Sequence, residues 1–161
     1  ANISSIPFNN SMRSAIVLSL ILAAAAAHTS GASSVAVSPQ GAMAATDAAK
    51  KVAIFAAGCF WGVEITFQRT AGVLATEVGY TGGKASSTDP TYKEICTGTT
   101  DHAEAVRIEF DETKTSFAEL LDVFFDNHDP TTTNRQGPDV GSQYRSAIFY
   151  TEESQKIEAE A

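Results

Sequence analysis

The chain has 161 residues, a length that suits one folded domain, and its 19 acidic and 11 basic residues give a formal net charge of −8. This charge argues against a nucleic-acid-binding protein, which needs a basic patch. Two cysteines and three histidines, scattered along the chain, exclude a disulfide-dense scaffold and any standard zinc-ligand spacing, so we expect no bound metal.

The first 49 residues differ in composition from the rest. Residues 1–46 contain no Asp or Glu, and their one basic residue, Arg13, precedes the 13-residue apolar run 15–27. That run is short for a membrane-spanning helix, which needs about 20 residues, and it fits the core of a secretory signal. The acid-poor stretch after it also suits a plastid transit segment. We predict that residues 1–49 are a targeting segment and linker for the secretory pathway or a plastid; a short membrane anchor or a buried helical hairpin is the alternative.

Hydrophobic periodicity predicts the elements of residues 50–161. Residues 51–57 form a continuous apolar run typical of a buried strand, and residues 59–71 carry apolar side chains at helical spacing. Residues 73–80 are rich in strand-forming residues and end at a glycine turn. Residues 104–111 alternate between apolar and polar, which predicts a half-buried strand.

A helix, a strand and the start of another helix follow in the second half of the domain. Residues 116–128 predict a helix that starts with a capping box, residues 144–151 predict a strand, and another helix begins at residue 152. The order β-α-β-β-α-β predicts an α+β fold, a two-layer sandwich with a ferredoxin-like split β-α-β core. Because the sequence stops inside the last predicted helix, we expect residues 50–161 to be a domain truncated at its C-terminus. The long connections 81–103 and 129–143 are predicted to be functional loops.

The segment Gly58-Cys59-Phe60-Trp61-Gly62 concentrates the chemistry. Cys59 falls between a predicted strand and the start of a predicted helix, where the helix dipole favours the thiolate, the reactive form. The two glycines would allow a tight turn and leave space around the sulfur, and two aromatic side chains follow the cysteine. We predict a nucleophile on the floor of an apolar pocket; an inert buried cysteine among core aromatics is the alternative.

The GCFWG segment after a strand resembles the A class of peptide methionine sulfoxide reductases. The resemblance extends over residues 51–161 nearly without a break, in the family's order. It implies a two-layer α/β sandwich and a thiol-dependent oxidoreductase that reduces methionine S-sulfoxide, free or in proteins, as repair of oxidative damage. The matching blocks are GYTGG (79–83), TYKE (91–94), HAEAV (102–106), NHDP (127–130), RQG (135–137), DVG (139–141) and QYRS (143–146).

The resemblance assigns catalytic roles to five residues. Cys59 would attack the sulfoxide sulfur, and Glu104 would give a proton to the sulfoxide oxygen. Tyr92 and Tyr144 would orient that oxygen through their hydroxyls, and Asp139 would support the site. These roles are physically sensible, because the oxygen is a poor leaving group until it is protonated and a Glu among aromatics keeps its proton to higher pH. A solvated carboxylate, ordinary packing and a turn residue are the alternatives for these positions.

The resemblance also implies how the substrate is held and how the enzyme is recycled. Phe60 and Trp61 would form the walls of the pocket for the terminal methyl group. The reaction leaves Cys59 as a sulfenic acid and needs no bound cofactor, only an external thiol reductant, for which thioredoxin is expected. The thiol that resolves the sulfenic acid is Cys96, a cysteine beyond this sequence or an external thiol. We expect a monomer whose mature domain does not bind membranes.

Three rival interpretations remain open on the sequence. Cys59 could serve a cysteine hydrolase with His102 or His128 as its base, although we expect both histidines to be structural hydrogen-bonding residues. The aromatic pocket could belong to a binding module without catalysis, which would tolerate Cys59→Ser. The chain could also be an inactive fragment of a reductase.

Overall fold

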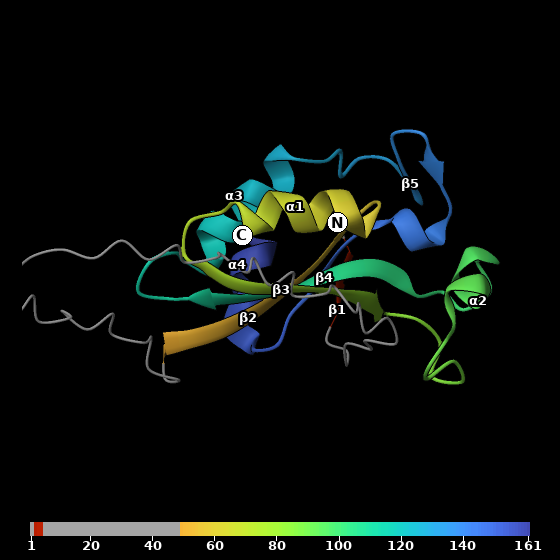
Figure 1. Ribbon diagram of the computed structural model, residues 1–161, viewed down its shortest axis with the longest axis horizontal. Helices are drawn as coiled ribbons and strands as arrows, with labels where there is room; N and C mark the ends of the chain where they lie inside the picture. Colours follow the sequence, from red (N-terminus) through yellow and green to blue (C-terminus); the bar gives the residue numbers. More distant parts are fainter. Residues whose placement is uncertain (1, 5–48) are drawn as a thin grey trace, which may run out of the picture. The chain divides into compact units, whose positions relative to one another are not determined.

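The computed structural model describes residues 2–4 and 49–161, and all structural statements below concern these residues (Figure 1). Most of the predicted targeting segment, residues 5–48, therefore lies outside the described part. Within the described ranges, no helix has both the length and the apolar character that a membrane crossing requires.

The sheet confirms the predicted topology. Strands β2 (Lys50–Ala57), β3 (Val73–Thr81), β4 (Ala103–Asp111) and β7 (Ser146–Phe149) lie in the order β7-β2-β4-β3, and each neighbouring pair is antiparallel. This order is the split β-α-β arrangement, in which β4 inserts between the two strands that the first helix connects. A short strand not expected from the sequence, β1 (Asn2–Ser4), adds to the edge in parallel to β7.

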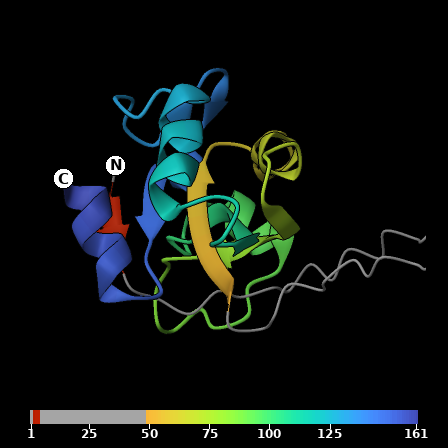
Figure 2. The same ribbon diagram turned by 90° about the vertical axis from the view of Figure 1, so that its left-hand side faces the viewer.

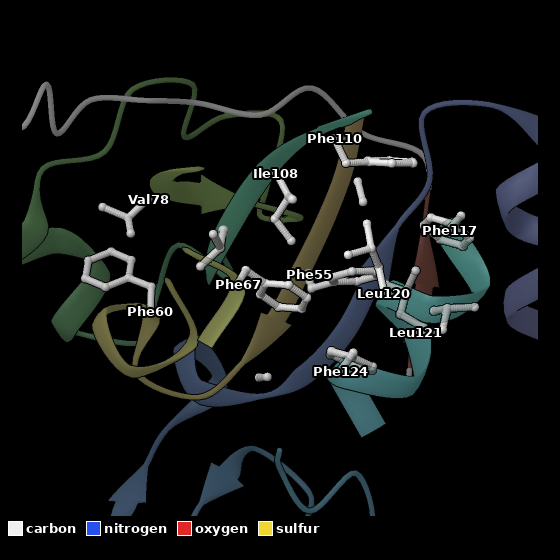
Figure 3. Packing of buried hydrophobic residues seen from close by; sticks show 14 of the residues in the cluster. Phe55, Phe60, Phe67, Val78, Ile108, Phe110, Phe117, Leu120, Leu121 and Phe124 are labelled. Carbon is white, nitrogen blue, oxygen red and sulfur yellow. The ribbon is translucent and has the colours of Figure 1, made fainter. Parts of the chain in front are cut away.

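Two helices, α1 (Phe60–Gln68) and α3 (Phe117–Asp126), lie over the same face of the sheet (Figures 1 and 2). A third, α4 (Glu153–Glu160), packs against α3. The core between the helices and the sheet is rich in phenylalanine (Figure 3). The ring of Phe55 stacks on Phe67 and Phe124, with centroids 5.4 and 5.0 Å apart. Burying such a side chain contributes about 1.5–3 kcal/mol, so this layer fixes the helices over the sheet.

The helix that the sequence defined best forms as predicted. Ser116 precedes α3, and its hydroxyl accepts the N–H of Glu119 at 3.2 Å, while the Glu119 carboxylate accepts the N–H of Ser116 at 2.7 Å. This reciprocal capping box satisfies two N–H groups that a helix start otherwise leaves without partners.

The two long connections contain short elements that periodicity missed. The first includes α2 (Tyr92–Cys96), and the second includes β5 (Arg135–Gln136), β6 (Asp139–Val140) and the 3₁₀ turn η2 (Ser142–Tyr144). The predicted strand 144–151 was therefore wrong at its start, since Tyr144 ends a 3₁₀ turn. Elements of two to five residues are too short to show a hydrophobic period, so local capping and pairing define them instead.

Candidate active site

Cys59 occupies the N-cap position of α1, directly after β2. Its backbone is non-helical, with φ −57° and ψ 116°, while its carbonyl accepts the N–H groups of Gly62 at 3.2 Å and Val63 at 3.4 Å. The half-buried side chain makes no capping hydrogen bond. The position of Cys59 at the positive end of the helix dipole is confirmed.

The two glycines that flank this segment have different roles. Gly58 has a φ of +100°, and a Cβ there would lie 2.7 Å from Cγ of Gln136, so both its backbone and its surroundings require glycine. Gly62 lies inside α1, where a Cβ would meet nothing within 4 Å. The prediction of a tight turn is thus confirmed at Gly58 and wrong at Gly62.

Glu104 is a buried carboxyl close to the segment that carries Cys59. It lies near the start of β4, opposite Tyr80 of β3, and it is 3% exposed. Its Oε2 accepts the N–H of Phe60, the residue after Cys59, at 3.1 Å. Burial raises the pKa of Glu104, and the charge of Asp139 raises it further, against the opposing effect of the Phe60 N–H. The site therefore contains a carboxyl that keeps its proton to higher pH than an exposed glutamate.

Three tyrosine hydroxyls interact electrostatically with this carboxyl. Burial, followed by the charge of Glu104, raises the pKa of Tyr80 and of Tyr144. For Tyr92 the pKa is raised first by a hydrogen bond with Cys96 and then by charged neighbours that include Glu104. All three hydroxyls thus stay protonated donors. Sequence reasoning missed Tyr80, although its place in an inward-facing strand position was a usable signal.

A cavity of about 310 Å³ opens between α1 and α3, and both Cys59 and Asp139 line it. Asp139 reaches this wall because β6 pairs with β5 in a hairpin, in which Gln136 lies opposite Asp139. Sequence reasoning did not single out Gln136, which also lines the cavity. The remaining wall consists of Ala57, Gly62, Val63, Thr66, Phe67, Val123, Phe124 and Asn127.

The two aromatic residues after the cysteine lie elsewhere. Phe60 is 2% exposed and packs in the core against Tyr80, with ring centroids 5.7 Å apart. Trp61 is 64% exposed, and its ring centroid lies 6.0 Å from that of Phe60. Neither belongs to the wall of the cavity between α1 and α3. Cys59 therefore lines a cavity whose wall does not include the two aromatic side chains that follow it in the sequence.

Both candidate histidines are structural hydrogen-bonding residues, as predicted. In His128, Nδ1 lies 2.6 Å from the carbonyl oxygen of Phe124 and Nε2 lies 2.7 Å from Oγ of Ser146. In His102, Nε2 lies 2.7 Å from the carbonyl oxygen of Ser87. Neither imidazole lines the cavity at Cys59, which disfavours a hydrolytic Cys–His pair. Within the described ranges, no three His, Cys, Asp or Glu side chains are grouped to hold a metal ion.

The fold and this geometry define an α+β protein with a cysteine at the start of a helix and, next to it, a buried carboxyl whose pKa is raised. The family model described as peptide methionine sulfoxide reductase matches residues 51–161. Because this match covers more than half of the sequence, the chain belongs to the peptide methionine sulfoxide reductase family.

Curated relatives and solved structures agree with this assignment. The chain is 58% identical over 104 residues to peptide methionine sulfoxide reductase MsrA of Methanococcoides burtonii, covering 65% of this chain and 67% of that protein. It is 55% identical over 113 residues to the chloroplastic reductase A4 of Arabidopsis thaliana, covering 70% of this chain and 43% of that protein. The chain thus spans roughly half to two thirds of the curated relatives that it matches.

Two solved structures show the same fold. Methionine sulfoxide reductase A of Corynebacterium diphtheriae is 41% identical, with a TM-score of 0.65, over 70% of this chain and 52% of that one. Mxr1 of Saccharomyces cerevisiae in its reduced form is 38% identical, with a TM-score of 0.67, over 71% of this chain and 67% of that one. These similarities agree with the two-layer α+β architecture predicted from the sequence.

Proposed function

We propose that this chain reduces methionine S-sulfoxide, free or within proteins, to methionine, and so repairs oxidative damage. Membership in the family supports the reaction class. The observation that carries the proposal is the hydrogen bond from the Phe60 N–H to Glu104, because it joins a buried carboxyl of raised pKa to the residue that follows Cys59.

In the proposed reaction, the Cys59 sulfur attacks the sulfoxide sulfur while the oxygen accepts a proton. Glu104 is the proton donor, and its raised pKa suits a general acid working near neutral pH. Tyr92 and Tyr144 orient the oxygen as neutral hydroxyl donors. The oxygen passes to Cys59, so one sulfoxide and one thiol become methionine and one sulfenic acid.

Asp139, Phe60 and Trp61 have supporting roles in this proposal. The negative charge of Asp139 helps Glu104 to retain its proton. Trp61 is the exposed aromatic that receives the substrate's methyl group, and Phe60 supports it from the core through their ring contact. We place the methyl group at this aromatic surface because a polarizable sulfur or methyl packs well on an aromatic ring.

Recycling of Cys59 needs two thiols and no bound cofactor. The first thiol condenses with the sulfenic acid, releasing water and forming a disulfide, and the second reduces that disulfide. Yeast Mxr1 has been solved in complex with Trx2, an association that belongs to Mxr1. We propose thioredoxin as the reductant of this chain as well. Cys96 is exposed and contacts Tyr92, which makes it one candidate for the first thiol.

For residues 1–49 we propose a targeting role toward the secretory pathway or a plastid. The apolar run 15–27 behind a single arginine supports this proposal. One matched relative is described as chloroplastic, which is a property of that protein. Fusing residues 1–49 to a fluorescent protein and imaging the cell tests the proposal; diffuse fluorescence would contradict it.

The reductase proposal is tested by giving the 161-residue chain the separate S and R epimers of N-acetylmethionine sulfoxide. Excess dithiothreitol replaces the physiological reductant, and the methionine product is quantified. We expect product from the S epimer alone, and none after Cys59→Ser. A sulfenic acid trapped on Cys59 by dimedone would support the intermediate. A folded chain that reduces neither epimer would refute the proposal and favour the binding module, and ester or amide cleavage would favour the hydrolase.

A further inference from the structure

Gln136 joins three parts of the site through one side chain. It ends strand β5, pairs across the hairpin with Asp139, and lines the cavity that contains Cys59. It also approaches Gly58, where a Cβ would lie 2.7 Å from its Cγ and 2.8 Å from its Cβ. The aliphatic part of Gln136 thus occupies the space beside the turn that presents the nucleophile.

The amide end of the same side chain is fixed to the backbone of Asp129. Its Oε1 accepts the Asp129 N–H at 3.2 Å, and its Nε2 donates to the Asp129 carbonyl at 3.1 Å. Asp129 is itself anchored, because it follows His128, whose imidazole bonds to the end of α3 and to Ser146 of β7. Gln136 therefore connects the β5–β6 hairpin to Asp129, whose neighbour His128 is bonded to α3 and β7.

We propose that Gln136 is a positioning residue, which holds the hairpin bearing Asp139 against the turn that carries Cys59. A glutamine suits this role because its amide can donate and accept at once, while its two methylene groups fill the space above Gly58. A glutamate would lose the donor, and an alanine would lose both bonds and the contact.

The position of the hairpin affects Glu104, because the hairpin carries the negative charge of Asp139. Asp139 raises the pKa of both Glu104 and Tyr144, so a hairpin that moves away should let Glu104 lose its proton at lower pH. The titratable groups that interact with this carboxyl are Tyr80 on β3, Tyr92 on α2, Asp139 on β6 and Tyr144 on η2.

The test compares 161-residue chains carrying Gln136→Ala or Gln136→Met with the parent. Gln136→Met keeps the aliphatic contact with Gly58 but cannot bond to Asp129. Glu104 is titrated by the chemical shift of its carboxyl carbon after ¹³C labelling of glutamate, with Glu104→Gln to assign the signal. We expect Glu104 to titrate at lower pH in both variants, and Asp139→Asn combined with Gln136→Ala to give no further shift than Asp139→Asn alone.

Turnover gives a second measurement, which rests on the proposed function. We expect kcat to fall by about tenfold to a hundredfold in Gln136→Ala, with a smaller change in KM, because displaced catalytic groups cost rate more than binding. Gln68→Ala is the matched control, since the Gln68 amide donates to Thr76 of β3 and Gln68 does not line the cavity.

The outcomes separate the two proposals. A parent chain without turnover would refute the proposed function, whereas the carbon titration would still test Gln136. Folded variants in which Glu104 titrates as in the parent would overturn the positioning role. If Gln136→Ala does not fold, Gln136→Met decides. A loss of folding by both would also overturn it, because Gln136 would then belong to the structural frame.

Discussion

The two carboxyl groups of the site belong to regions built in different ways. Glu104 lies on β4, an interior strand of the sheet, in a frame of regular strands and helices packed around a phenylalanine core. Asp139 lies on a two-residue strand in the segment 129–144, which is held by hydrogen bonds between side chains and backbone such as those of Gln136. The contrast separates a buried carboxyl, held by regular strands and helices, from a charge on a small hairpin that raises the pKa of that carboxyl.

The largest effect on the rate is expected from a change at Glu104 on β4. Glu104→Gln keeps an oxygen that can accept the Phe60 N–H but removes the proton that the sulfoxide oxygen needs. We expect the rate of S-sulfoxide reduction to fall by about 10²–10⁴-fold, the usual contribution of a general acid. Product methionine measured with dithiothreitol as reductant gives the comparison.

Glu109→Gln is the matched control for this change. Glu109 lies on the same strand, half-buried and paired with Arg107 at 2.7 Å, on the polar side of the predicted alternation. Its variant should keep the parent rate. A Glu104→Gln chain that is folded by circular dichroism and retains a third or more of the parent rate would show that Glu104 is not the acid.

A smaller effect on the rate is expected from a change at Asp139 on the β5–β6 hairpin. Asp139→Asn removes a charge that raises the pKa of Glu104, so Glu104 should lose its proton at lower pH. Because the protonated form is the active one, the alkaline fall of the rate should shift toward lower pH. At neutral pH we expect a loss of roughly threefold to tenfold, or about 0.7–1.4 kcal/mol. A rate profile from pH 5 to 9 with an unshifted alkaline limb would contradict this assignment.

The buried carboxyl of Glu104 should also lower the stability of the folded chain as the pH rises. Burial raises the pKa of Glu104 above its ordinary value near 4.5, so the folded state holds this proton more tightly than the unfolded state does. The stability that this proton contributes is complete below the ordinary pKa and is lost as the pH rises through the folded pKa. Glu104→Gln should therefore be more stable than the parent at pH 8, with the difference shrinking toward pH 4. Urea unfolding at both pH values measures this, and a difference independent of pH would argue against it.

The smallest effect on the rate is expected from a change at the start of α3, away from Glu104 and Asp139. Ser116→Ala removes the hydroxyl that caps α3 and should lower the free energy of unfolding by about 1 kcal/mol. Because Ser116 lies at the start of α3 and does not line the cavity, we expect kcat to remain near the parent value. Thermal unfolding together with turnover checks both statements; a large loss of kcat would mean that the frame and the site are more tightly coupled.

Periodicity predicted most of the frame. The alternation in residues 104–111 and the helical spacing in 116–128 gave the two elements and their faces, because a buried face imposes a period of 2 or 3.6 on the sequence. The same alternation places Glu104 on the inward face with Val106, Ile108 and Phe110, which was a signal for its burial. The short elements α2, β5, β6 and η2 gave no such signal, since no period fits into so few residues.

The candidate site was predictable in its residue types but not in its arrangement. Cys59 at a helix start followed from the boundary between a strand and a helix. The roles of Asp139 and Tyr144 came from the family resemblance, and their approach to Glu104 depends on tertiary packing of the segment 129–144. Gln136 lies in the RQG block that matches the family, but the sequence contains no sign of its contacts, because these join residues whose proximity exists only in the folded chain.

The position of β2 has a consequence for biosynthesis. The edge of β2 that faces away from β4 pairs with β7. Ile54 therefore cannot pair with Phe149 until the ribosome has synthesised β7. Until then the nascent chain can pair β2 only with β4, and the apolar segment KVAIFAA presents an open row of N–H and C=O groups. Such an edge invites pairing with another nascent chain. Chaperone protection is therefore most needed between the synthesis of β4 and the emergence of β7.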